Sequence, residues 1–245
     1  MPPLVSVIVP TWRRHDCLPL IHDCFCRQTY PNLEMLVLDD TEQPSTHFAD
    51  AAPNIRYSHA PARLPIGTKR NRLVAEARGE IIVHFDDDDF YAPDYVARMV
   101  DALGDDDLVK LSGWYAYGVA QKTFGYWDTA AAAPIQFMVD STQPLTPVHG
   151  QPVQDGNVRG FGFSYVYRRS AWQVAPFPDR DFGEDYAWVQ AIAGRCRIRV
   201  LPDVQGLVLH IIHQANTSRI FPQFLLPPVL LTHLFGEDVL RYVAR

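Results

Sequence analysis

The chain has 245 residues, of which 47% are hydrophobic and 20% are charged, and its formal net charge is −6. This composition is that of a globular protein with a sizeable core, and it excludes an intrinsically disordered chain. An acidic chain repels the phosphate backbone, so a partnership with nucleic acid is excluded as well. We expect a single domain over residues 1–245, since this length fits one large domain.

Cysteine usage and hydropathy bear on where the protein works. The four cysteines show no spacing typical of a secreted disulfide framework. The sequence shows no signal peptide, and no window reaches the ~18 uninterrupted apolar residues of a spanning helix. We therefore expect a cytoplasmic protein without a transmembrane segment. The apolar tail over 219–245 leaves peripheral contact with the inner face of a membrane open.

Apolar β-branched runs alternate with segments of helical spacing through the first half of the chain. Strands that are apolar along their whole length are typical of a mostly parallel sheet flanked by helices, so we expect an α/β fold. In chain order, the expected elements are the strand 4–9, a helix around 18–25, the strands 33–38 and 55–57, the helix 67–77, the strand 81–85 and the helix 93–103.

The second half of the chain has a weaker pattern. Its expected elements are the strand 164–167, the helix 186–193 and the strand 196–201, with loops over 130–133 and 144–156. His210 and His213 are expected on a helix, where their spacing is typical of metal ligands, but no Cys or Glu completes a zinc set.

Polar side chains directly follow three of the expected strands. Thr11, the pair Asp39-Asp40 and the run Asp86 to Asp89 all stand at such strand ends. In open α/β sheets these ends meet at one edge, where ligands bind. Carboxylates gathered there repel each other unless a cation joins them, and Mg²⁺ or Mn²⁺ prefers such oxygens. A metal-bound phosphate or diphosphate compound is the implied ligand, although an Asp pair that caps a helix or a turn stays open for residues 39–40.

Ordered motifs over residues 4–218 resemble those of the family 2 glycosyltransferases. The matching segments are 5–11 (VSVIVPT), 28–34 (QTYPNLE), 38–41 (LDDT), 67–71 (GTKRN), 77–82 (ARGEII), 86–93 (DDDDFYAP), 183–185 (GED) and 213–218 (HQANTS). The resemblance implies a GT-A fold, with a Rossmann-like nucleotide-sugar-binding half over about 1–103 and a mixed acceptor-binding half, which also carries the catalytic base, over about 104–218.

The resemblance also implies a nucleotide-diphosphate sugar donor, a UDP-sugar first of all. Residues departing from the family pattern are Trp12-Arg13 after the first strand and Thr41-Glu42 after the second, and both bear on which nucleotide is bound. The implied donor contacts are Pro10, Thr11, Asp39 and Asp40 around the base and ribose, Lys69 and Arg70 at the phosphates, and Asp87 within the D-x-D motif.

For the metal, Mn²⁺ or Mg²⁺, the resemblance implies Asp86 and Asp88 of the D-x-D motif as ligands, with Asp88 foremost and His213 as a further ligand. Asp185 corresponds to the catalytic base of inverting members, with Glu184 as its neighbour. A carboxylate is suited to take the proton of an acceptor hydroxyl. Two other interpretations stay open, a helix cap for Asp185 and a surface histidine for His213.

The expected function is metal-dependent, inverting transfer of a sugar to a hydroxyl of a glycan or lipid-linked acceptor, a step of polysaccharide biosynthesis. Two alternatives stay open. A nucleotidyltransferase would carry a glycine-rich, arginine-containing loop after its first strand, and Pro10 to Arg13 contain no glycine. A non-catalytic nucleotide- or glycan-binding module on the same fold would bind without turnover. The oligomeric state is not indicated by the sequence.

Overall fold

The computed structural model describes residues 2–214, 216 and 219–244. Ala215, Thr217 and Ser218 of the motif over 213–218 therefore lie outside the described residues. The chain forms two compact units, which are described separately. The first contains residues 1–87, 93–110 and 159–200, and the second contains 88–92, 111–158 and 201–245. The expectation of one domain over 1–245 stays a prediction.

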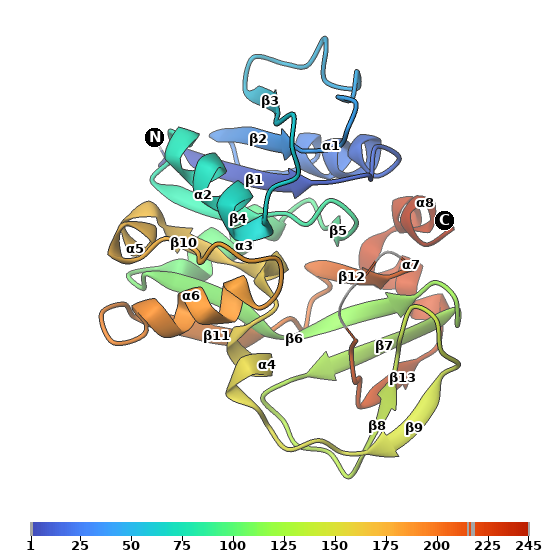
Figure 1. Cartoon of the computed structure of the whole chain (residues 1–245). Helices are drawn as coiled ribbons and strands as arrows, with labels where there is room; N and C mark the ends of the chain where they lie inside the picture. Colours follow the sequence, from blue (N-terminus) through green and yellow to red (C-terminus); the bar gives the residue numbers. More distant parts are fainter. Residues whose placement is uncertain (1, 215, 217–218, 245) are drawn as a thin grey trace. The chain divides into compact units, whose positions relative to one another are not determined.

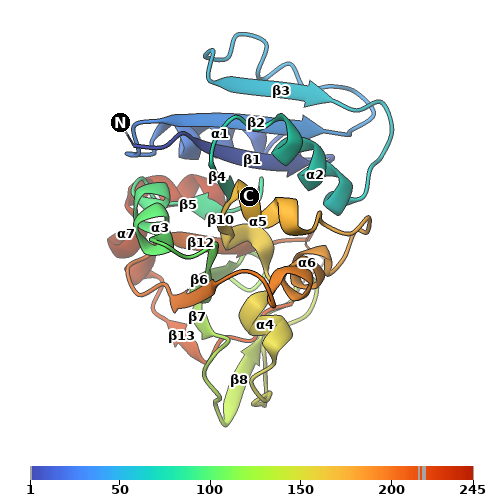
Figure 2. The same cartoon turned by 90° about the vertical axis from the view of Figure 1, so that its left-hand side faces the viewer.

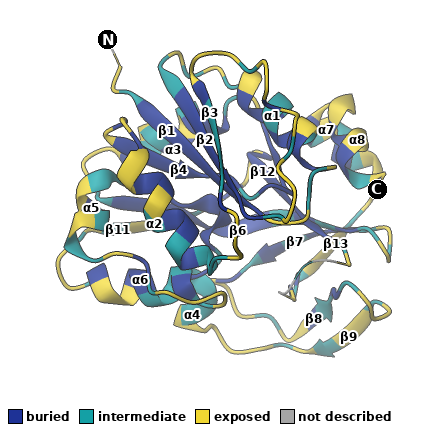
Figure 3. Cartoon of the chain, turned by 45° about the horizontal axis from the view of Figure 1, so that its top comes forward, coloured by how far each residue is buried: buried dark blue, intermediate teal, exposed yellow. Residues whose placement is uncertain are grey.

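Parallel strands make up most of the sheet in the first unit (Figure 1). Four of them stand side by side in the order β3-β2-β1-β4, and β10 joins β4 in the antiparallel sense. Nearly every residue of β1, β2 and β4 is buried, as their continuous apolar sequences require (Figure 3). The strands are β1 Val5–Thr11, β2 Leu33–Asp39, β3 Ile55–His59, β4 Ile81–His84 and β10 Val166–Arg168.

Helices cover the sheet of the first unit, and α2 packs against β1 and β2 (Figure 2). The start of α2 needs glycine, because a Cβ at Gly67 would lie 1.9 Å from the carbonyl oxygen of Pro178. This close approach brings the segment 177–181 against α2. The helices are α1 Leu18–Cys26, α2 Ile66–Glu76, α3 Tyr95–Leu103, α5 Arg169–Val174 and α6 Glu184–Ile192, with the 3-10 turn η1 Gly162–Ser164.

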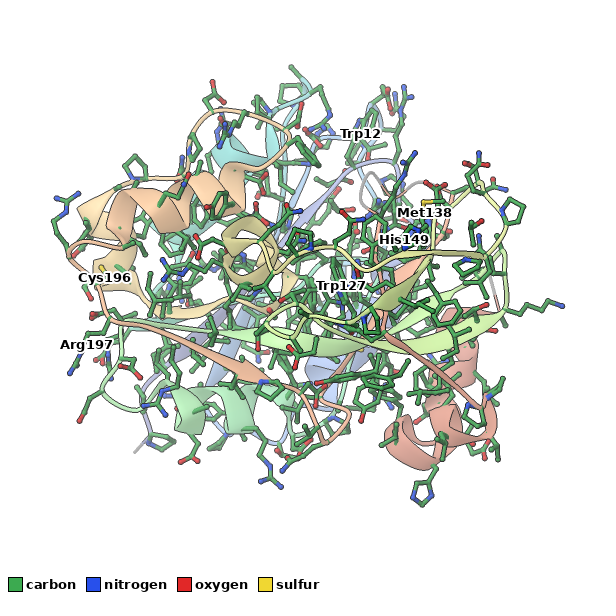
Figure 4. The ribbon with its side chains drawn as sticks, turned by 90° about the horizontal axis from the view of Figure 1, so that it is seen from below. Trp12, Trp127, Met138, His149, Cys196 and Arg197 are labelled. Carbon is green, nitrogen blue, oxygen red and sulfur yellow. The ribbon has the colours of Figure 1, made fainter. Side chains whose placement is uncertain are left out.

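The second unit is built around the long strand β6, Leu108–Gly118, whose first three residues belong to the first unit. β7 pairs with β6 in the antiparallel sense and β12 pairs with it in parallel. β8 and β9 form a separate antiparallel pair, on which Figure 4 labels Met138 and His149. The other elements of this unit are β5 Phe90–Tyr91, β7 Thr123–Asp128, β8 Ile135–Met138, β9 Thr146–His149, α4 Asp155–Arg159, β12 Val208–Ile212, β13 Phe224–Leu226, α7 Val229–Phe235, η2 Glu237–Val239 and α8 Leu240–Val243. Most of β11, Ile198–Pro202, belongs to the first unit.

The α/β fold is confirmed, and the strands and helices expected up to residue 104 are present within one or two residues of their predicted ends. Two predictions in the second half are wrong. His210 lies in the strand β12 and His213 just after it, because the β-branched run around them forms a buried strand, not a helix. The expected loop over 144–156 contains the strand β9 and the first residues of α4. Among the residues that the structure describes, no helix is both long and apolar enough to cross a membrane.

Candidate functional site

The ends of β1 and β2 place two candidate residues side by side. Thr11 and Asp39 are paired residues at the carboxyl ends of these parallel strands, and both are buried. Asp39 accepts hydrogen bonds from the backbone N–H of Thr41 (2.8 Å), the hydroxyl of Tyr57 (2.7 Å) and the ring of His15 (2.8 Å). Burial opposes ionisation of Asp39, but these bonds outweigh it and lower its pKa. Asp39 is therefore a buried carboxylate at the edge where a ligand of this fold binds.

Asp40 is fixed by cations from two different segments. Its Oδ1 accepts from Nζ of Lys69 (2.9 Å), and its Oδ2 accepts from Nη1 of Arg63 (3.1 Å) and the backbone N–H of Leu64 (2.6 Å). Lys69 also donates to the backbone carbonyl of Thr11 (2.9 Å), and burial lowers its pKa, although Asp40 opposes this shift. Both oxygens of Asp40 thus already have protein partners.

An exposed tryptophan follows β1. The indole of Trp12, labelled in Figure 4, is 38% exposed. The guanidinium groups of Arg13 and Arg63 lie over its ring, 4.9 Å and 4.5 Å from the centroid. Contacts of this kind hold the ring in a fixed orientation. The departure from the family pattern at Trp12-Arg13 therefore places an ordered aromatic face beside Thr11.

The acidic segment over 86–89 follows β4 directly and contains a candidate metal centre. Asp86, Asp88 and Asp89 each offer a carboxylate oxygen, and these oxygens lie within 4.8 Å of one another. Three such ligands fit Mn²⁺ or Mg²⁺, which prefer carboxylate oxygens. The cluster contains Asp89 in addition to the predicted Asp86 and Asp88.

Basic side chains face each aspartate of the segment within its own unit. In the first unit, Nη2 of Arg70 lies 3.7 Å from Asp86, and Nη1 of Arg14 donates to Asp87 (2.8 Å). In the second unit, the partners are histidines. Nε2 of His213 lies 2.9 Å from Asp88, and Nδ1 of His210 lies 2.9 Å from Asp89, which also accepts from the backbone N–H of Ile211 (2.9 Å).

Arg70 joins the acidic segment to the start of α6. Its guanidinium is buried and forms ion pairs with Glu184 and with Asp86. Burial opposes the charge, but the carboxylates of Glu184, Asp86 and Asp185 raise the pKa of Arg70. A buried cation needs such compensation. Arg70 and Glu184 therefore form a fixed pair beside Asp185.

Asp185 is the second residue of α6 and remains partly exposed. Its Oδ2 accepts from the backbone N–H of Gly162 (2.8 Å) and its Oδ1 from that of Tyr186 (2.6 Å). Gly183 is the N-cap residue just before the helix and has a positive φ of 67°, which glycine adopts freely. The bond to Tyr186 has the character of a helix cap, while the bond to Gly162 ties the carboxylate to another segment.

Buried polar side chains that the sequence analysis did not single out hold that segment, residues 159–162. The hydroxyl of Tyr165 donates to the carbonyl of Arg159 (2.5 Å), and Nζ of Lys110 donates to that of Gly160 (2.6 Å). Nδ1 of His84 bonds the carbonyl of Gly162 (3.0 Å). Burial and the charge of Arg70 lower the pKa of His84, so its ring is neutral. His84 and Lys110 each stand in an otherwise apolar run of the sequence, and this pattern could have identified them as buried polar residues.

Lys110 makes the stability of the fold depend on pH. Burial lowers its pKa to about 7 from its ordinary 10.5, although Asp185 opposes this shift. Between these values the unfolded chain holds a proton that the folded chain lacks, so stability rises with pH. We expect the free energy of unfolding of the wild type to rise, relative to Lys110→Met, by about 1 kcal/mol per pH unit between pH 7 and 9. Denaturant unfolding of both proteins measures this, and parallel pH profiles would contradict it.

The first unit thus brings together most of the predicted site residues: Pro10, Thr11, Asp39, Asp40, Lys69, Arg70, Asp86, Asp87, Glu184 and Asp185. Asp88 and His213 lie together in the second unit. Lys69 and Arg70 are bonded to protein carboxylates in this structure.

Known proteins with similar sequences are glycosyltransferases by name. Residues 6–166 match the sequence profile of the family described as Glycosyl transferase family 2. The chain is 29% identical over 179 residues to "Putative glycosyltransferase EpsH" of Bacillus subtilis (strain 168), covering 69% of this chain and 48% of that protein. It is 34% identical over 98 residues to "Putative colanic acid biosynthesis glycosyl transferase WcaA" of Escherichia coli (strain K12), covering 37% of this chain and 34% of that protein. The chain therefore spans about half or less of the length of these relatives.

Solved structures show the same fold. S. aureus TarS 1–349 in complex with UDP-GlcNAc has a TM-score of 0.62 at 18% identity, covering 87% of this chain and 60% of that one. Mannosyltransferase PcManGT from Pyrobaculum calidifontis, in complex with GDP-Man and Mn²⁺, has a TM-score of 0.59 at 21% identity, covering 89% and 59%. At these identities the likeness concerns the fold alone and confirms the expected GT-A architecture. With a family match over residues 6–166 and this fold, the chain belongs to glycosyl transferase family 2.

Proposed function

We propose that this protein is a metal-dependent, inverting glycosyltransferase that moves a sugar from a nucleotide-diphosphate sugar to a hydroxyl of a glycan or lipid-linked acceptor. The observation that carries the proposal is the acidic cluster of Asp86, Asp88 and Asp89 directly after β4. Family membership and the fold support a nucleotide-sugar donor.

The donor base and ribose would lie against the ends of β1 and β2. Pro10 and Thr11 end β1 beside Asp39, and the hydroxyl of Thr11 is buried with no hydrogen-bond partner among the described residues. A buried hydroxyl of this kind costs free energy until a ligand satisfies it. Asp40 would keep the end of β1 in place through Lys69, which also donates to the carbonyl of Thr11. The partly exposed indole of Trp12 follows Thr11 directly. A UDP-sugar is our first candidate, and the TarS complex with UDP-GlcNAc supports it.

The carboxylate oxygens of the acidic cluster fit a divalent cation. Asp86 and Asp88 would hold Mn²⁺ or Mg²⁺, with His213 beside Asp88 and Asp89 as a further oxygen ligand. When bound, the ion supplies positive charge that stabilises the departing diphosphate. The Mn²⁺ in the PcManGT complex supports this choice of metal. The bond from Arg14 to Asp87 would help to fix the acidic segment. Arg70, which is paired with Glu184, would do the same through Asp86.

Asp185 would act as the general base. As the acceptor oxygen forms its bond to the anomeric carbon, its proton passes to the Asp185 carboxylate, and the bond to the diphosphate oxygen breaks with its electron pair leaving on the diphosphate. This direct displacement inverts the anomeric centre. Glu184 is buried and paired with Arg70, so we assign it to positioning Asp185 rather than to proton transfer. The name of the E. coli relative supports polysaccharide assembly as the setting. A cytoplasmic location and peripheral contact with a membrane stay predictions.

The test is release of the nucleoside diphosphate from a panel of UDP-N-acetylglucosamine, UDP-glucose and GDP-mannose, with Mn²⁺ and with EDTA, each with and without added glycan acceptors. We expect release from one donor class in Mn²⁺ that stops in EDTA. Equal release under both conditions would contradict metal dependence. Tight binding of a donor without any release would identify a non-catalytic binding module instead.

A further inference from the structure

We infer that His84 is a positioning residue for Asp185 and acts through the backbone of Gly162; this inference rests on the proposed function. A continuous series of hydrogen bonds leads from Tyr167 in β10, through His84 in β4, to Gly162 and Asp185. Every member except Asp185 is buried in the first unit.

The direction of each bond follows from the groups involved. The carbonyl of Gly162 can only accept, so Nδ1 of His84 carries a proton and donates it over 3.0 Å. Nε2 of the neutral ring is then an acceptor for the hydroxyl of Tyr167 at 3.1 Å. Gly162 in turn donates its own N–H to Oδ2 of Asp185 over 2.8 Å. His84 thus orients one glycine, and the glycine holds the carboxylate.

The glycine has little freedom to move elsewhere. The preceding residue, Phe161, has a positive φ of 59°, which a non-glycine residue adopts only when its surroundings enforce it. Lys110 and Tyr165 fix the carbonyls of residues 160 and 159. A Cβ on Gly162 would lie 3.0 Å from Cβ of Asp185 and 3.1 Å from Nη1 of Arg70, so no other residue fits without a shift.

The consequence concerns the orientation of the base. With the bonds from Gly162 to Oδ2 and from Tyr186 to Oδ1 in place, the rotation of the Asp185 carboxylate is fixed, and each oxygen keeps a lone pair that can take a proton. Small misplacement of a reacting group lowers rate much more than it lowers ligand affinity. Because the His84 ring is buried, it does not exchange protons with an acceptor, and its contribution is geometric.

Three variants of His84 separate the donor at Nδ1 from the volume of the ring. The amide nitrogen of His84→Asn takes the place of Nδ1 and keeps a donor for the Gly162 carbonyl. The amide of His84→Gln reaches the place of Nε2 and removes the side-chain donor of that carbonyl, which keeps only the backbone N–H of Tyr165 (3.2 Å). His84→Leu removes both ring nitrogens. Transferase kcat and the dissociation constant of UDP with Mn²⁺ are measured for each.

We expect His84→Gln and His84→Leu to lower kcat about tenfold or more, with UDP affinity unchanged. His84→Asn should stay close to wild type. Equal kcat in the Asn and Gln variants, whether both are high or both low, would overturn the inference. If the leucine variant fails to fold, the Asn and Gln pair still decides.

A second readout separates this inference from the proposed function. In protein labelled with ¹⁵N-glycine, the amide of Gly162 is identified by its loss in Gly162→Ala and by its shift in Asp185→Asn. We expect its signal to move in His84→Gln and to stay in place in His84→Asn, and an unmoved signal in both would overturn the inference. A wild type that turns over no donor would end the proposed function, whereas the Gly162 signal would still report whether His84 positions Asp185.

Discussion

We expect Asp185→Asn to lower kcat by about 10²- to 10⁴-fold, the range typical for loss of a general base. The amide keeps the size of the side chain and can still accept from the backbone N–H of Gly162 through its oxygen, so the fold and the ion pair of Arg70 with Glu184 persist. Donor binding should therefore stay near normal while the rate collapses. Steady-state kinetics with the best donor, together with the dissociation constant of UDP, separates the two quantities.

The matched control for this substitution is Asp101→Asn, which changes an exposed carboxylate on α3 of the same unit and should leave kcat unchanged. A comparable loss of rate and donor affinity in Asp185→Asn would mean that Asp185 is structural, as a helix cap would be. An unchanged rate would remove it from the reaction altogether.

The second large effect is expected at the metal. Asp88→Ala should weaken the Mn²⁺-dependent binding of UDP by about 100-fold or more, because even groups that only support a metal ligand contribute 10- to 100-fold. The substitution removes one of the three carboxylates of the cluster and the partner of His213. Calorimetric titration of UDP in Mn²⁺ measures the change.

Asp94→Ala serves as the control for Asp88→Ala, since Asp94 lies nearby in the sequence, is only half-buried and pairs with Arg98, outside the acidic cluster. We expect its UDP titration to match the wild type. If Asp88→Ala retains the same Mn²⁺-dependent affinity, Asp88 is not a metal ligand, and the cluster has another role.

The first half of the fold could be predicted because its strands are buried on both faces. Continuous apolar runs such as those of β1 and β2 leave little choice of structure, and the polar residues at their ends mark the edge where ligands bind. The second half could not be predicted in the same way. The short run of β12 fits a buried strand as well as a helix, so the position of His210 was predicted wrongly.

The partners of charged residues are the part of the site that the sequence does not reveal. Lys69 and Arg70 were expected at the donor phosphates, and in the structure they are bonded to Asp40 and Glu184. Those carboxylates lie 29 and 114 residues away along the chain, so only the folded chain shows the pairing. The same holds for His84 and Gly162, whose bond joins segments 78 residues apart.

The central claim is that the acidic segment after β4 binds a nucleotide together with a divalent cation. Calorimetric titration of the wild-type protein with UDP and with GDP, in Mn²⁺ and again in EDTA, tests it most directly. The account predicts saturable binding of one of the two nucleotides in Mn²⁺ that is lost in EDTA. Binding of equal affinity in both solutions, or no binding of either nucleotide in Mn²⁺, would contradict it.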